Sequence, residues 1–473
     1  MSTESSASTD RTRRIRRQSR GFRRAVVATL GILGLATTGL AVAGAFRGPH
    51  LADASVASAT ALERAGQRLV LQADQAIDPV DAADVSVTPD VPIEVSSEER
   101  TITVRFTGML RTLTDYTVTV AVSGAATGVD GTLSYAFTTP DLDIAVLVRD
   151  LDGPDEVRGR TVSGDEATTL FAADRIQEFA LLRDGVAAVV LDESGANGRL
   201  MIAPDGAQVT EEITLPGPGR LQQLRASDTT DRLGVLFTSA DSDATDARLS
   251  QLLLIDRLDP SGVAHPVTGL DGEAISVLDW RFVPGTPYLV VQAFDHSMLL
   301  IDTAATDAVP VPLGEHAELR GFLPGTLQLV VADPLSGSTI DLETGESAPL
   351  ELPDDQLDET AYPGKVVALG GDSYLEVASR PAPGEGFVLD YEILLVSREG
   401  VEVLYDPDAG IPIRDICLSP NAQYVAVEVQ DPEGEPDGYP NVSGRTLSTT
   451  YFVDLASGEA NRAIAGFAAS WCS

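Results

Sequence analysis

Side chains that could bind a cation are concentrated in the stretch DSDATDARLSQL, which starts at Asp241. The stretch begins like a calcium loop, with Asp241, Asp243 and Asp246 as candidate ligands. It then departs from the EF-hand pattern, because Asp246 stands where glycine is required and Leu252 where a bidentate glutamate is required. These three aspartates therefore remain a candidate Ca²⁺ site, and a solvated loop is the alternative explanation.

Motifs that carry enzymatic chemistry are missing from the sequence. It contains no Gly-x-Ser-x-Gly, no His-Glu-x-x-His, no glycine-rich phosphate loop and no Ser-x-x-Lys. The four histidines lie far apart, and a single histidine on a surface is usually only solvated. We therefore predict that the chain is not an enzyme and has no cofactor, with Ca²⁺ as the one exception left open.

Composition bounds the fold and the partners. The apolar content of 43% and the charged content of 22% are those of a globular protein, and aliphatic side chains far outnumber the 5% of aromatic ones. Many short strands built from such residues favour an all-β fold. The net charge of −38 would repel a phosphate backbone, so nucleic acid is excluded as a partner.

The N-terminal region differs sharply from the rest. Residues 1–24 contain eight arginines and two acidic residues, and residues 25–46 have no charge at all. This pattern predicts a basic cytoplasmic segment followed by a transmembrane anchor or a signal peptide. The protein would then be either a single-pass membrane protein with its C-terminal part outside, attached through residues 25–46, or a secreted protein. Ala41 and Ala43 form a cleavage pattern, and the choice between anchor and signal stays open.

A small β-domain is predicted next. Residues 47–66 are small and polar and indicate a stalk. In residues 67–140, stretches such as TITVRF and YTVTVAV alternate apolar and polar residues between turn residues, which indicates a β-sandwich. The order of features, with LTDYTVTV and a closing FTTP, resembles bacterial Ig-like domains of surface-layer and envelope proteins. The resemblance implies a spacer module in an exported envelope protein of actinobacterial type.

A repeated unit of about 45–50 residues fills residues 141–473, the period of a four-stranded propeller blade. Two clear copies begin at VLDWRFVPGTPYLVVQAF and LRGFLPGTLQLVVAD. These copies resemble the blades of TolB-like and WD40-like propellers, in which a turn with proline or glycine separates two apolar strands. The resemblance implies a β-propeller, and the count of units predicts seven blades.

Ring closure is predicted from the two ends of the repeat region. The tail GFAASWCS is interpreted as an innermost strand that completes a blade with DIAVLVRD, EVRGRTVSG and ATTLFAAD. Cys417 and Cys472 would then lie side by side on neighbouring innermost strands. Outside the cytoplasm such a pair is expected to form a disulfide, and two buried free thiols are the alternative.

The connections between the second and third strands of the blades should share one face of the ring. The longest and most acidic of them lie near the two ends of the repeat region. The predicted binding face consists of Asp150, Asp152, Asp155, Glu156, Asp431, Glu433, Glu435 and Asp437. Long loops on a rigid scaffold often carry binding sites, although acidic loops also serve solubility.

The predicted function is that of a non-enzymatic binding or scaffold protein of the cell envelope. Its acidic face would hold a protein partner with a basic surface, or a divalent cation. The alternative is an extracellular propeller enzyme, of hydrolase or lactonase type, that uses a carboxylate-bound metal in the central channel.

Overall fold

The structure is a computed structural model, and its described residues divide into two compact units. It describes residues 27–32, 47–58, 62, 65–206, 210–259, 261–305, 308–353, 357, 360–370, 372–382, 388–460 and 462–472. Unit 1 comprises Met1–Val56, Arg68–Arg105 and Tyr116–Phe137, and unit 2 comprises Ala57–Gln67, Phe106–Asp115 and Thr138–Ser473. Nearly all regular structure is β-strand, so the predicted all-β fold is confirmed.

The predicted single-pass membrane location is wrong. Within the described ranges, no helix is both long enough and apolar enough to cross a bilayer. Of the uncharged segment only residues 27–32 are described, and they are helical. Residues 25, 26 and 33–46, and the basic segment 1–24, lie outside the described residues.

Unit 1 consists of two antiparallel sheets, in the strand orders β1-β2-β5-β4 and β3-β6-β7. Its elements are β1 (Leu51–Val56), β2 (Arg68–Ala73), η2 (Ala82–Asp84), β3 (Val85–Thr88), β4 (Ile93–Glu98), β5 (Thr101–Phe106), β6 (Asp115–Ser123) and β7 (Asp130–Thr138). Alternate residues are buried along β6, where Tyr116, Val118 and Val120 face inward. This period of two is that of a strand with one face in a core.

The segment expected to be a stalk contributes a strand instead. Within residues 47–66, β1 pairs antiparallel with β2, with Ala54 opposite Leu71 and Val56 opposite Leu69. Leu69 and Leu71 are completely buried, so β1 covers an edge of the sheet that would otherwise be open. The sequence of β1 lacks a clear apolar alternation, which is why composition alone indicated a linker.

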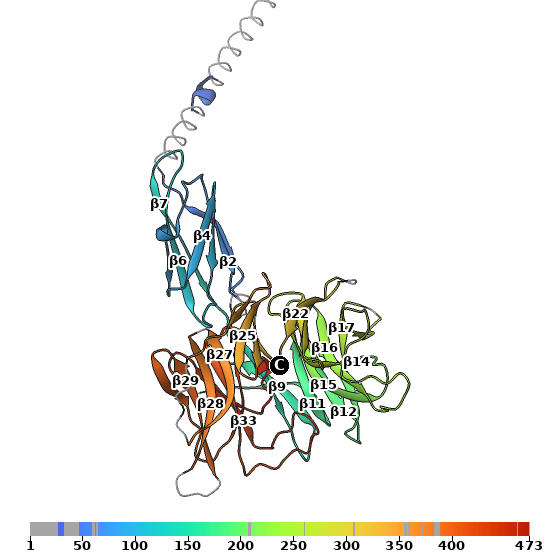
Figure 1. The fold of residues 1–473 in the computed structure, drawn as a ribbon. Coiled ribbons are helices and arrows are strands. Elements are labelled where there is room, and N and C mark those ends of the chain that lie inside the picture. The colour runs from blue at the N-terminus through green and yellow to red at the C-terminus, as the bar shows by residue number, and fades with distance from the viewer. Residues whose placement is uncertain are drawn as a thin grey trace, which may run out of the picture. The chain divides into compact units, whose positions relative to one another are not determined.

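The described residues of unit 2 form seven small antiparallel sheets, whose strands follow one another in chain order (Figure 1). The first three sheets are β8 (Asp143–Val148), β9 (Asp155–Thr161) and β10 (Thr168–Ala173); β11 (Ile176–Leu182), β12 (Gly185–Leu191), β13 (Gly198–Pro204) and β14 (Glu211–Glu212); and β15 (Gly219–Ala226), β16 (Arg232–Ser239), β17 (Gln251–Asp256) and β18 (His265–Pro266).

The next two sheets are β19 (Val277–Phe282), β20 (Tyr288–Ala293), β21 (Ser297–Asp302) and β22 (Val311–Glu315); and β23 (Glu318–Phe322), β24 (Gln328–Asp333), β25 (Ser336–Asp341) and β26 (Ser347–Pro349). The last two are β27 (Tyr362–Gly370), β28 (Ser373–Pro381), β29 (Leu389–Ser397) and β30 (Gly400–Tyr405); and β31 (Ile413–Leu418), β32 (Tyr424–Gln430), β33 (Ser448–Asp454) and β34 (Arg462–Ala465). A row of such four-stranded meanders is typical of a propeller-like fold.

The first and last sheets of unit 2 are joined by the C-terminal residues, which do not form the expected full strand. Leu147 in β8 and Phe467 form an antiparallel bridge, with N–O distances of 2.7 and 3.0 Å. Ala468 then adopts a φ of 53°, and the chain continues as the 3-10 helix η3 (Ser470–Cys472). The left-handed residue turns the backbone away from the ladder, so pairing stops after one bridge.

Candidate functional site

The two predicted acidic loops of unit 2 contact each other. One connects β8 to β9 and the other connects β32 to β33. Arg149, at the start of the first loop, forms an ion pair with Asp437 of the second, and their side chains are 1% and 0% exposed. Arg149 also donates to Val442 O at 2.8 Å, and to Gln177 O at 2.9 Å. The guanidinium therefore holds the second loop against the first and against β11.

Asp155 belongs to the same buried cluster. It accepts hydrogen bonds from the Tyr439 hydroxyl and from the Ile176 N–H, the latter at 2.7 Å. The Arg149 guanidinium lies 3.6 Å from the centre of the Tyr439 ring. Burial and the bond to Asp155 both raise the pKa of Tyr439, so the phenol remains a donor. We call Arg149, Asp155, Asp437 and Tyr439 the loop-joining cluster.

The prediction that all eight carboxylates form an accessible face is therefore wrong for two of them. Asp155 and Asp437 are buried. The Asp437 carboxylate forms an ion pair with Arg149, and the Asp155 carboxylate accepts a hydrogen bond from Tyr439. Sequence alone shows eight carboxylates in two loops, and it does not show that Arg149 and Tyr439 reach them. The six others are exposed or half-buried: Asp150, Asp152, Glu156, Asp431, Glu433 and Glu435.

Three of the six remaining carboxylates form local hydrogen bonds that leave their charge near solvent. Asp150 accepts the N–H of Asp152 at 2.9 Å, and Asp431 accepts the N–H of Glu433 at 2.9 Å. These bonds within tight turns fix the loops. Glu156 accepts a bond from Arg158 Nε at 2.6 Å. Asp150, Asp152, Glu433 and Glu435 are thus the exposed carboxylates that flank the loop-joining cluster.

The second acidic loop also reaches the first strands of two other sheets. Asn441 accepts a hydrogen bond from Gln222 Nε2 of β15 at 2.9 Å, and its own amide nitrogen lies 3.4 Å from Gln177 Oε1 of β11. Gly444 allows a close approach, because a Cβ there would lie 2.4 Å from Phe467 Cζ. The loop is therefore positioned by residues from the first three sheets of unit 2 and by Phe467.

Glu178 of β11 gives a pH dependence that can be measured. Burial raises its pKa to about 7, although the carboxylate accepts the Leu224 N–H at 2.9 Å. Between about pH 4.5 and 7 the unfolded chain loses a proton that the folded chain keeps, so this group makes stability fall as pH rises. We expect Glu178→Gln to remove up to about 1.4 kcal/mol per pH unit of this fall. Denaturant unfolding at several pH values checks it, and parallel pH profiles of the two proteins would contradict it.

The two cysteines are joined in the structure. Cys417 of β31 and Cys472 of η3 form a disulfide, with a Cα–Cα distance of 5.2 Å. Cys472 lies in a 3-10 turn and not on an innermost strand, so the pairing does not depend on matching strand positions. The bond fixes the C-terminal residues to the last sheet.

The candidate metal ligands do not assemble. Asp241, Asp243 and Asp246 are all exposed in the connection between β16 and β17, and Asp241 accepts the N–H of Asp243 at 3.0 Å. In the part of the chain that the structure describes, no group of three or more His, Cys, Asp or Glu could hold a metal ion. The first aspartate caps its own turn, so these side-chain positions lend no support to the Ca²⁺ site, which stays a prediction.

Similarities to solved structures are weak, and the chain matches no protein-family model and no curated protein. TolB from Acinetobacter baumannii is 11% identical over 75% of this chain and 77% of its own, with a TM-score of 0.32. A putative 6-phosphogluconolactonase from Bacteroides fragilis is 13% identical over 70% and 96%, with a TM-score of 0.38. An auxiliary nutrient binding protein from Bacteroides ovatus is 13% identical over 77% and 92%, with a TM-score of 0.29.

Sequence identities and TM-scores this low carry no argument about function. The description of unit 2 as propeller-like therefore rests on the order of its sheets. None of these similarities supports the Ig-like resemblance of residues 67–140 or the actinobacterial type.

Proposed function

We propose that the chain is a non-enzymatic binding protein that uses the two acidic loops of unit 2 to hold a protein partner with a basic segment. The observation that carries this proposal is the buried loop-joining cluster, which brings the loops of the first and last sheets together. Four exposed carboxylates, Asp150, Asp152, Glu433 and Glu435, then belong to one surface. A fixed surface loses little entropy when it binds, which favours a binding role.

The proposal includes a seven-bladed ring closed by the C-terminal residues, with unit 1 as an Ig-like spacer. Seven sheets in unit 2 and the bridge between Leu147 and Phe467 support the ring. Two sheets of four and three strands support the Ig-like reading of unit 1. The net charge of −38 favours a cationic partner over an anionic one.

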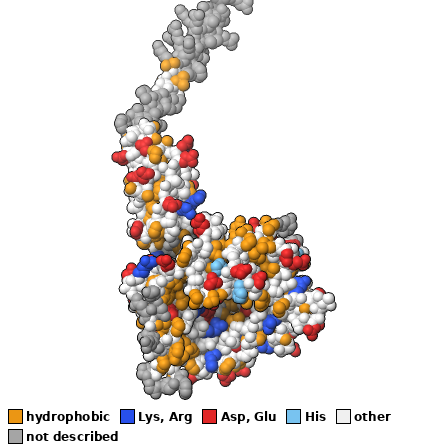
Figure 2. Space-filling model, in the orientation of Figure 1, with side chains coloured by type: hydrophobic (Ala, Val, Ile, Leu, Met, Phe, Trp, Pro, Cys, Tyr) orange, Lys and Arg blue, Asp and Glu red, His pale blue; other side chains and the backbone are white. Residues whose placement is uncertain are grey.

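Figure 2 shows acidic side chains in small groups over the visible faces of both units. Charge alone therefore does not single out one surface, and the experiment has to compare two surfaces of equal charge. The test variant neutralises the four exposed loop carboxylates: Asp150→Asn, Asp152→Asn, Glu433→Gln and Glu435→Gln. The matched control neutralises four exposed carboxylates elsewhere: Asp205→Asn, Glu211→Gln, Glu343→Gln and Glu346→Gln.

We expect the test variant to bind a fluorescent decalysine peptide about tenfold more weakly than the unmodified chain in 0.05 M salt, because four attractions of a few tenths of a kcal/mol each are lost. The control variant should lose less than about twofold. Fluorescence anisotropy measures both. Binding should also fall steeply as the Debye length shrinks from about 10 to about 3 Å.

Equal losses in the two variants would show general attraction to an acidic protein and reject the loop surface. Calcium binding that disappears in the test variant alone, without an effect on the peptide, would assign the surface to a cation and reject a protein partner.

A further inference from the structure

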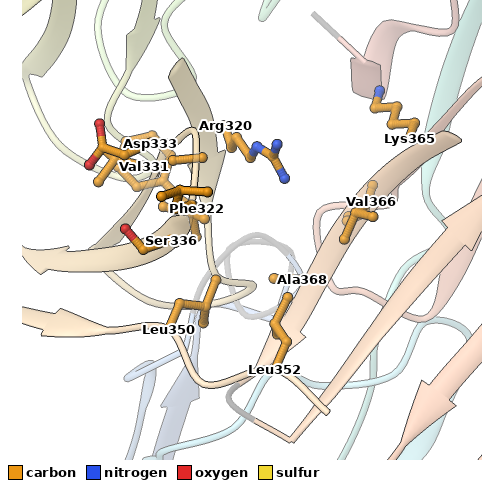
Figure 3. Close-up of a pocket in the computed structure, with 15 residues that line it drawn as sticks. Arg320, Phe322, Val331, Asp333, Ser336, Leu350, Leu352, Lys365, Val366 and Ala368 are labelled. Carbon is orange, nitrogen blue, oxygen red and sulfur yellow. The ribbon is translucent and has the colours of Figure 1, made fainter. Parts of the chain in front are cut away.

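A cavity of about 420 Å³ lies between two neighbouring sheets of unit 2. One wall comes from β23, β24 and β25, and the other comes from β27 (Figure 3). Leu350 and Leu352, in the segment after β26, also line it. Its volume is in the range of sites for small organic ligands, about 300–1,000 Å³.

The cavity exists because side chains do not fill the space between these two sheets. They do fill the spaces between other neighbouring sheets. Val290 and Val331 share one hydrophobic cluster across sheets β19–β22 and β23–β26, and Leu375 and Val427 share another across the last two sheets. Among the described residues, none of these clusters combines buried side chains of β23–β26 with buried side chains of β27–β30. Small residues, including Ala332, Gly337 and Ala368, line the opening.

Most of the residues that line the cavity are aliphatic, and the cavity is partly open to solvent. Phe322, Leu350, Leu352 and Val366 contribute apolar surface to the lining (Figure 3). Leu335, in the turn between β24 and β25, also lines the cavity and is 99% exposed. Exposed apolar surface at a concave site favours a ligand with an apolar body.

Two cations stand at one end of the cavity, on opposite walls (Figure 3). Arg320 belongs to β23, and Lys365 of β27 is the only lysine in the chain. Each has an acidic neighbour: Arg320 Nε lies 3.0 Å from the exposed Glu318, and Lys365 Nζ lies 2.6 Å from the half-buried Asp415. Both cations are themselves solvent-exposed, and pairs of this kind near the surface contribute little, so they can exchange for a ligand carboxylate.

Asp333, the acidic residue of the cavity lining, is bonded to His316 and Ala317. Asp333 accepts the N–H of Ala317 at 3.0 Å and lies 3.1 Å from Nδ1 of His316. These bonds lower the pKa of Asp333 and satisfy its carboxylate within β22–β24. The cation pair therefore sets the charge that a ligand meets, within a chain whose net charge is −38.

We propose that this cavity binds an aliphatic monocarboxylate, with the carboxylate between Arg320 and Lys365 and the hydrocarbon chain against Phe322, Leu350 and Leu352. Guanidinium and ammonium groups donate well to a carboxylate, and guanidinium can do so with two parallel bonds. Each buried methylene should strengthen binding about threefold to fourfold. The site involves other sheets than the acidic loops, so it stands independently of the proposed protein partner.

Calorimetric titration of the full chain with octanoate, butanoate and octylamine tests the proposal. Octanoate should bind at least tenfold more tightly than butanoate, and octylamine should not bind measurably, because its ammonium group meets two cations. Equal binding of octanoate and octylamine, or no binding of octanoate, would overturn the proposal.

Three variants locate the site. Arg320→Gln with Lys365→Gln should weaken octanoate binding at least tenfold, and Ala368→Phe should abolish it by filling the cavity. Arg199→Gln is the matched control, because Arg199 is also an exposed arginine in a surface ion pair, 3.5 Å from Glu212. A thermal melt of each variant verifies folding, and octanoate binding that survives Ala368→Phe would place the ligand elsewhere and reject the cavity.

Lys365 also offers a direct spectroscopic probe. Reductive methylation with ¹³C-formaldehyde labels one lysine side chain and the α-amino group, since the sequence has no other lysine. Octanoate should shift the dimethyl-lysine resonance and leave the α-amino resonance in place. A titration that moves neither resonance, or both equally, would contradict contact with Lys365.

Discussion

Replacing Arg149 with leucine is expected to lower the free energy of unfolding by about 3–5 kcal/mol, because it leaves the buried carboxylate of Asp437 without its cation. Only backbone donors would remain for that carboxylate, among them the N–H of Gly444 at 2.7 Å. The carbonyls of Gln177 and Val442 would lose their donor at the same time. Urea unfolding measures the loss.

The control for this experiment is Arg199→Leu. Arg199 and Glu212 are each 52% exposed in their side chains, and pairs of this kind contribute less than about 1 kcal/mol. Equal midpoints for the two variants would show that the buried pair does not hold the loops. If the midpoint of Arg149→Leu falls as expected, the variant should also bind decalysine more weakly, because the two acidic loops are then no longer held together.

The repeated strands of unit 2 were predictable, and the reason is local. A short run of apolar and β-branched residues predicts a buried strand, and proline or glycine marks the turn that follows. The stretch VLDWRFVPGTPYLVVQAF therefore indicates β19, its turn and β20 without any tertiary information. Resemblance to TolB-like blades added the propeller-like arrangement of these strands.

The candidate site was only partly predictable, because its chemistry depends on residues far apart in the chain. Arg149 and Asp437 are 288 positions apart, and no spacing rule connects them. An arginine directly after the apolar stretch DIAVLV was the available signal, since a cation at the end of a buried strand needs a partner. No comparable sequence signal pointed to Arg320 and Lys365. The cavity between them arises because side chains are too small to fill the space between two neighbouring sheets.

For the C-terminal residues, too, one feature could be predicted from the sequence and another depends on contacts with distant residues. The pairing of Cys417 with Cys472 could be anticipated from their being the only two cysteines. The conformation around Cys472 could not, because Phe467 pairs with Leu147 of the first sheet and Ala469 donates to Glu428 of the last one at 2.7 Å. These contacts impose a turn on a stretch whose apolar residues alone indicate a strand.

Deleting residues 466–473 is expected to have the largest effect of all, and to exceed clearly the effect of removing the disulfide. Cys472→Ser should cost about 4 kcal/mol by the loop-closure model, for a separation of 55 residues. The deletion also removes the buried Phe467, worth about 3–5 kcal/mol, and the donor to Glu428, whose side chain is 0% exposed. These losses approach the about 5–15 kcal/mol that stabilise a typical folded domain.

Circular dichroism and urea unfolding of four proteins separate the contributions: the unmodified chain, Cys417→Ser, Cys472→Ser and the deletion. The two single variants should lose the same free energy, because either change opens the same loop in the unfolded chain. The deletion should leave unit 2 without a cooperative transition at 25 °C, since the bridge to Leu147 and the bond from Trp471 Nε1 to Asp143 O, 2.9 Å long, both disappear. A deletion no worse than Cys472→Ser would mean that the bridge to Leu147 and the bond to Asp143 add nothing measurable to stability, and it would contradict the expected closure between the first and last sheets.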